Sequence, residues 1–201
     1  LERGTSALLF ASGMAAITVL LETVPQGAHV VAPDVMYYGT RDWMKRLEGL
    51  KRITLTLFDP KQPGALEAAL QKGKTDLVWI ETPLNPTWDV IDIEAAARAA
   101  HAAGAILVVD NTFLSPVLLR PLEHGADLVL QTTTKWVSGH GDALGGIAAG
   151  SKALVDPIRR QTDLLGGAAS PFNSWLIARG ARTLPLRIER ASQNANDVAA
   201  F

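Results

Sequence analysis

The chain has 201 residues, 48% of them hydrophobic and 19% charged, so it is long enough to bury a substantial core in one globular domain. Nineteen basic and twenty acidic residues leave a formal net charge of −1, which excludes the one-signed charge of a typical nucleic-acid-binding protein. The lack of cysteine excludes disulfides and thiolate metal sites, and the longest apolar stretch is too short to span a bilayer. We therefore expect a cytoplasmic protein that binds neither nucleic acid nor membrane.

Short apolar runs alternate with helical patterns through the first 150 residues. The runs of strand length are 7–10, 29–33, 53–57, 76–80, 105–110, 126–131 and 145–150. Most are apolar throughout, which is typical of parallel strands covered on both faces. Helices are predicted at 13–24, 40–48, 64–72, 92–103 and 116–124. The clearest of them has Asp92 as its N-cap and Gly104 as its stop signal.

After residue 150 the pattern is helical only, and the last helical segment reaches the end of the chain without a cap. The alternation of strands and helices predicts an α/β fold, with a mostly parallel sheet of seven strands and helices on both faces. We find no repeat and no flexible linker, so residues 1–201 form a single α/β unit that we expect to be cut from a longer protein.

Polar residues follow four of the predicted strands, at the edge where open α/β sheets bind their ligands. The sequence reads ASGMAA after the first strand, ETPLNP after the fourth, DNT after the fifth and TTTK after the sixth. Because the carboxyl ends of parallel strands share one edge, these segments bring together a helix N-terminus, acidic side chains, threonine hydroxyls and a lysine.

Each feature taken alone has an ordinary explanation. Ser12 and Gly13 could be a plain helix cap, and Thr132 and Thr134 could reflect the preference of threonine for strands. Asp110 could form a salt bridge, and Lys135 could be a surface charge. Taken together, a phosphate cradle at a helix N-terminus, a partly desolvated acid and a lysine match the needs of pyridoxal 5′-phosphate (PLP). We therefore predict a PLP site.

Three alternatives stay open on the residues alone. The segment GHGDALG has the glycine spacing of a dinucleotide-binding loop, but such a loop follows a strand directly and opens a helix. A metal site on His140 and Asp142 lacks a second histidine at ligand spacing. The chain could also be a non-catalytic fragment.

The motifs ASGMAA, DVMYYGT, ETPLNP, VVDNTF, RPLEHGAD, TTTKWVSGHGDALGG and RGARTLPLRIER occur in this order. Together they resemble the PLP-dependent enzymes of Cys/Met metabolism, the trans-sulfuration family. Its members include cystathionine γ-synthase, cystathionine γ- and β-lyases, O-acylhomoserine sulfhydrylases and methionine γ-lyase. The resemblance implies the type I fold of PLP-dependent transferases, with this chain as the PLP-binding large domain.

The resemblance also implies roles for individual residues. Lys135 would bond covalently to the cofactor and act as a catalytic base, and Tyr37 would stack on its ring and transfer protons. The full set of cofactor-binding residues is Gly13, Met14, Tyr37, Asn85, Asp110, Thr132, Thr134 and Lys135. Glu81, Thr112 and His140 would shape the surrounding loops.

The chain departs from the family at several positions. Thr132 stands where serine is common, and Tyr38 where glycine is usual. Gly39 stands where methionine γ-lyases have cysteine, which argues against that activity, and Asn85 favours chemistry at the γ carbon. The expected reaction is therefore of the cystathionine γ-synthase or γ-lyase type, with sulfhydrylase or β-lyase as alternatives.

Family members are about twice as long, so an N-terminal arm and a C-terminal domain are expected to be missing. The family's sites need a partner chain, which implies a homo-oligomer, a dimer of dimers, for the full-length protein.

Overall fold

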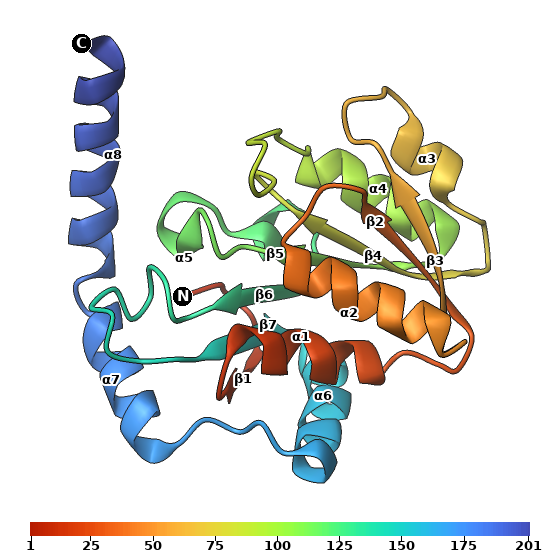
Figure 1. Ribbon diagram of the computed structural model, residues 1–201, viewed down its shortest axis with the longest axis horizontal. Helices are drawn as coiled ribbons and strands as arrows, with labels where there is room; N and C mark the ends of the chain where they lie inside the picture. Colours follow the sequence, from red (N-terminus) through yellow and green to blue (C-terminus); the bar gives the residue numbers. More distant parts are fainter.

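The computed structural model describes all residues, 1–201, and contains one seven-stranded sheet (Figure 1). The strands are β1 (Ser6–Phe10), β2 (Ala28–Pro33), β3 (Ile53–Phe58), β4 (Thr75–Glu81), β5 (Ile106–Asp110), β6 (Leu128–Thr132) and β7 (Gly146–Gly150). Their order across the sheet is β1-β7-β6-β5-β4-β2-β3, and β7 alone runs opposite to the other six strands. The predicted α/β fold with a mostly parallel seven-stranded sheet is confirmed.

Helices surround this sheet and continue beyond it. They are α1 (Gly13–Glu22), α2 (Tyr38–Gly49), α3 (Ala65–Ala69), α4 (Ile93–Ala103), α5 (Ser115–Leu118), the 3₁₀ helix η1 (Pro121–His124), α6 (Lys152–Leu165), α7 (Pro171–Ala181) and α8 (Leu184–Ala200). In Figure 1, α8 projects away from the sheet and carries the C-terminus. None of the helices has the length and apolar character needed to cross a membrane.

The continuous apolar character of the strands follows from burial on both faces. Successive side chains of a strand point to opposite faces, so Val30 joins one core cluster and Val31 the other. The first cluster lies against α1, α2 and α6, and it includes the fully buried Trp79. The second cluster lies against α4, whose alanines allow close packing on the sheet.

The helix predicted at 92–103 forms with the expected ends. The Asp92 side chain accepts a hydrogen bond from the Ala95 N–H at 3.0 Å, and Gly104 ends the helix with a φ of 86°.

The helix predicted at 116–124 is wrong as a single element, because it is split into α5 and η1. Leu119 and Arg120 between the two are extended, as expected of residues that lead into Pro121. The helix predicted at 64–72 is also shorter than expected, because Leu70 is already extended.

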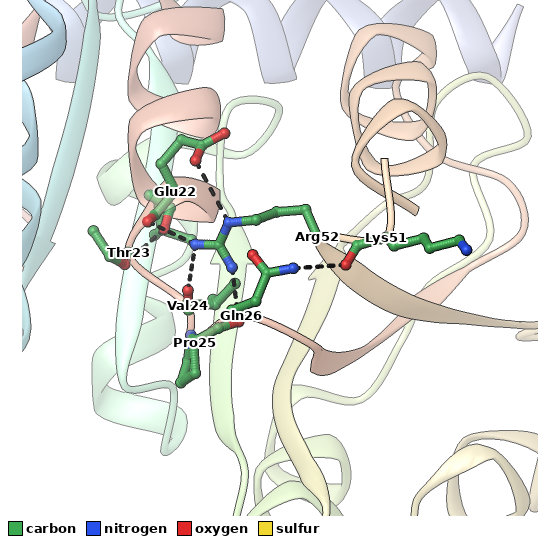
Figure 2. A network of polar contacts seen from close by, with 8 residues as sticks. Glu22, Thr23, Val24, Pro25, Gln26, Lys51 and Arg52 are labelled. Atoms are coloured by element: carbon green, nitrogen blue, oxygen red, sulfur yellow. Dashed lines mark hydrogen bonds and ion pairs between the residues drawn. The ribbon is translucent and has the colours of Figure 1, made fainter. Parts of the chain in front are cut away.

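The turn between α1 and β2 is held by Arg52, just before β3 (Figure 2). Its guanidinium donates hydrogen bonds to the carbonyls of Glu22 (3.1 Å), Val24 (2.6 Å) and Pro25 (2.8 Å). Gln26 in the same turn donates to the Lys51 carbonyl at 2.8 Å. These contacts satisfy the carbonyl of Glu22, which the end of α1 leaves without an intrahelical partner, and carbonyls of the turn that follows it.

A third core cluster joins α7 and α8 to the loop between β6 and β7. From α8, the Arg187 guanidinium donates to the carbonyls of Trp136 (2.7 Å) and Gly180 (2.9 Å). A Cβ at Gly139 would overlap this guanidinium, so only glycine allows the loop to lie so close to α8.

Candidate functional site

The polar segments that follow β1, β4, β5 and β6 meet around a cavity of about 360 Å³. Every residue predicted to bind the cofactor lines it: Gly13, Met14, Tyr37, Asn85, Asp110, Thr132, Thr134 and Lys135. The cavity lies at the carboxyl edge of the sheet, because Asp110 ends β5 and Thr132 ends β6. The fold therefore brings together residues that are spread over more than half of the chain.

The N-terminus of α1 forms one wall of the cavity. The Ser12 side chain caps the helix by accepting a hydrogen bond from the Ala15 N–H at 3.0 Å. The N–H groups of Gly13 and Met14, in the first turn, have no backbone acceptor and remain free for an anion. A Cβ at Gly13 would lie only 2.7 Å from the Thr132 Cβ, so glycine allows α1 to approach β6 this closely.

The two threonine hydroxyls are close to that helix and bond to the loop backbone. The Thr132 hydroxyl donates to the Gly145 carbonyl at 3.0 Å, and the Thr134 hydroxyl donates to the same oxygen at 3.3 Å. Each hydroxyl carries one hydrogen, so donation to a bound anion requires it to rotate away from Gly145.

Two carboxyl groups lie side by side in the sheet, because Glu81 and Asp110 are paired across β4 and β5. Burial raises the pKa of Asp110, and its carboxylate accepts a hydrogen bond from the Thr112 N–H at 2.9 Å. Burial and the charge of Asp110 raise the pKa of Glu81 to about 7. Asp110 is thus a half-buried acid that lines the cavity, where a cationic partner could lie beside it.

Tyr37 lies in the loop between β2 and α2, and its ring is 4.8 Å from the Tyr38 ring, centroid to centroid. A hydrogen bond to the Tyr38 side chain, then burial and the charges of Tyr38 and Asp110, raises the pKa of Tyr37. Tyr37 is therefore a protonated phenol near neutral pH. A Cβ at Gly39 would lie 2.8 Å from the Tyr37 ring and 2.9 Å from the Met14 sulfur, so a side chain at position 39 would disturb this wall.

Lys135 is an exposed residue three positions beyond the end of β6. It lines both the cavity described above and a second, more open cavity bounded by α8. The glycine-rich segment that follows it leads into the strand β7 rather than into a helix, so it lacks the context of a dinucleotide-binding loop. His140 bonds to the Ser138 carbonyl, and Asp142 pairs with Arg179.

The sequence did not single out Phe113, which lines both cavities and packs edge-on against Trp88 with ring centroids 4.4 Å apart. Its position three residues after Asp110, at the exit of a strand, was the available signal.

The whole chain, residues 1–201, matches the family described as Cys/Met metabolism PLP-dependent enzyme. The chain belongs to this family. Canavanine gamma-lyase of Rhizobium leguminosarum bv. trifolii is 44% identical, over 100% of this chain and 51% of the relative. Cystathionine gamma-lyase of Saccharomyces cerevisiae is 40% identical, over 100% of this chain and 52% of the relative.

The fold is shared as well. A crystal structure of a gamma-lyase from Micromonospora echinospora superposes with a TM-score of 0.87 at 40% identity, covering 92% of this chain and 49% of that one. The chain therefore spans about half the length of these relatives.

The residues around the cavity are compatible with the cofactor that gives the family its name. Free N–H groups at a helix N-terminus suit a phosphate, the half-buried carboxyl of Asp110 suits a protonated pyridine nitrogen, and a lysine amine suits the aldehyde.

Proposed function

We propose that this chain is the PLP-binding large domain of a trans-sulfuration enzyme that acts at the γ carbon of homoserine-derived or sulfur amino acids. The proposal rests mainly on the convergence of a helix N-terminus, Asp110, Tyr37 and Lys135 on one cavity. Membership of a PLP-dependent family supports the choice of cofactor.

The residues would divide the binding of PLP among them. The N–H groups of Gly13 and Met14, with the hydroxyls of Thr132 and Thr134, would hold the phosphate. Asp110 would accept a hydrogen bond from the pyridine nitrogen and keep it protonated. Tyr37 would stack on the ring. Asn85 would lie near the phenolic oxygen of the cofactor, and Lys135 would bond to its aldehyde carbon.

When bound, PLP supplies an electron sink that weakens the bonds at the substrate's Cα. The Lys135 amine, once displaced by the substrate amine, would take the proton from that carbon. Tyr37 would supply a proton to the group that leaves the γ carbon, because its raised pKa keeps the phenol protonated near neutral pH.

Chemistry at the γ carbon is the first choice because several relatives are named for it, among them a cystathionine gamma-synthase at 42% identity. The resemblance associates methionine γ-lyases with a cysteine at position 39. This chain has Gly39 there, and the surrounding atoms leave no space for a side chain, which argues against methionine γ-lyase activity. The proposed reaction is tested by an assay of the full-length protein with cystathionine, O-succinylhomoserine and O-acetylhomoserine. Ketoacid or thioether formation supports the proposal, and turnover of none of the three contradicts it.

The role of Lys135 is tested by the Lys135→Ala variant of the same protein. The variant should lose the visible-absorbing, borohydride-reducible adduct with PLP, whereas Lys74→Ala, which removes an exposed lysine outside the cavity, should keep it. An adduct that persists in Lys135→Ala would overturn the assignment.

We further propose that the full-length protein is a cytoplasmic homo-oligomer, a dimer of dimers. This extension is supported by the family resemblance alone. Light scattering on the purified protein measures the subunit number, and a monomer or a dimer would contradict this proposal.

A further inference from the structure

Glu81 occupies a special position at the edge of the candidate site. It is the last residue of β4 and is buried, with 6% of its surface exposed. Its two carboxyl oxygens accept hydrogen bonds from two different loops: Oε1 from the Asn85 N–H at 2.7 Å and Oε2 from the Tyr37 N–H at 3.1 Å. One carboxyl group thus joins the loops that carry two of the candidate cofactor contacts.

The charge on this carboxyl group depends on its neighbour in the sheet. Burial is the main reason that the pKa of Glu81 reaches about 7, and the charge of Asp110 raises it further. The two backbone N–H groups act in the opposite direction. Tyr37 faces Glu81 from the β2–α2 loop, and Lys135 is the cationic side chain that lines the same cavity.

A cation beside Asp110 would change this balance. It would cancel the negative charge that disfavours ionisation of Glu81, and the pKa of Glu81 would fall. A carboxylate is a stronger acceptor than a carboxylic acid, so ionised Glu81 would hold both N–H groups more firmly.

We propose that Glu81 is a positioning residue that couples a cation held by Asp110 to the two loops carrying Tyr37 and Asn85. The coupling rests on the proposed function, in which the protonated pyridine nitrogen of PLP is that cation. Filling of the site at Asp110 therefore tightens the wall made by Tyr37 and the loop of Asn85, and a proton leaves Glu81 for solvent.

The test measures proton release when pyridoxamine 5′-phosphate binds. This probe lacks the aldehyde, so no bond to Lys135 contributes. Calorimetry on the full-length protein freed of PLP, at pH 7 in two buffers of different ionisation enthalpy, gives the number of protons released. The parent should release about half a proton per site more than Glu81→Gln, because a group with a pKa of about 7 is half-protonated at pH 7.

Glu2→Gln is the matched control. Glu2 is a second buried carboxyl group with a pKa raised to about 7, but Asp110 is not among the causes and Glu2 does not line the cavity. Its removal should leave proton release as in the parent. Equal release by the parent and Glu81→Gln, or an equal decrease in Glu2→Gln, overturns the inference while leaving PLP binding intact.

A second measurement needs no variant. In the parent without cofactor, the NMR signals of the Tyr37 and Asn85 backbone amides should shift with pH, with a midpoint around pH 7. Binding of pyridoxamine 5′-phosphate should move this midpoint to lower pH. A midpoint that stays in place overturns the coupling. If the probe does not bind at all, the proposed function is contradicted instead. If the amide signals do not titrate around pH 7, the role of Glu81 in holding the Tyr37 and Asn85 N–H groups is overturned.

Discussion

Replacement of Gly13 by alanine tests how closely α1 and β6 approach at the candidate phosphate site. The added Cβ would lie 2.7 Å from the Thr132 Cβ and 2.9 Å from its hydroxyl oxygen, which is shorter than real carbon contacts. The Thr132 Cβ is fixed by the backbone of the strand, so rotation of the threonine side chain cannot relieve the shorter contact. Overpacking of this kind costs about 1–3 kcal/mol.

The helix can relieve that strain only by moving away from Thr132, and the N–H groups of Gly13 and Met14 then move away from the threonine hydroxyls. If the whole cost appears in binding, the PLP dissociation constant rises roughly 5- to 140-fold. Equilibrium titration of the full-length variant with PLP measures this, and thermal unfolding without PLP shows how much of the cost falls on the fold.

Gly49→Ala is the control, because Gly49 also lies in a helix but a Cβ there meets no atom within 4 Å. It should bind PLP like the parent and unfold at the same or a slightly higher temperature. A Gly13→Ala protein that matches the parent in both PLP affinity and unfolding temperature would show that α1 and β6 are not in close contact.

Two further predictions concern stability. The pKa of Glu2 is raised by burial to about 7, above its ordinary value of 4.5, so its protonated form is favoured by folding; this contribution is complete below pH 4.5 and is lost as the pH rises through 7. The unfolding temperature should therefore fall across that window in the parent and fall less steeply in Glu2→Gln, and an identical slope in both would refute the assignment. Arg52→Met removes the bonds to three carbonyls and should cost about 1–2 kcal/mol in the free energy of unfolding. Lys51→Met should change it by less than about 0.5 kcal/mol, because its exposed side chain points away from this network (Figure 2); equal effects of the two substitutions would contradict the role of Arg52.

The sequence allowed prediction of the features that depend on local pattern. Most of the strands could be predicted because burial on both faces makes them apolar throughout, and the cap at Asp92 could be predicted because capping depends on neighbouring residues. The cavity residues could be grouped because parallel strands expose their carboxyl ends at one edge. The split between α5 and η1 was not predicted, although Pro121 falls inside the predicted helix and is a residue that interrupts one.

Contacts between distant segments could not be predicted. The Glu2 side chain accepts hydrogen bonds from Asn111 and Gln131, which lie 109 and 129 positions further along the chain. A glutamate between a leucine and an arginine gives no sign of such burial. The two hydrogen bonds that Glu81 accepts from Tyr37 and Asn85 could not be predicted either, because their donors are backbone N–H groups, which every residue except proline carries.

The contact between Arg187 and the loop that follows Lys135 has a mechanical consequence. The guanidinium on α8 holds the carbonyl of Trp136, the residue next to the lysine, and Gly139 allows it to come that close. The long helix α8 is therefore coupled mechanically to the loop that carries Lys135 and Trp136. The backbone beside Lys135 is tied to α8 both by the Arg187 guanidinium and by the core cluster that includes Val137 and Ile188, and neither link passes through the sheet.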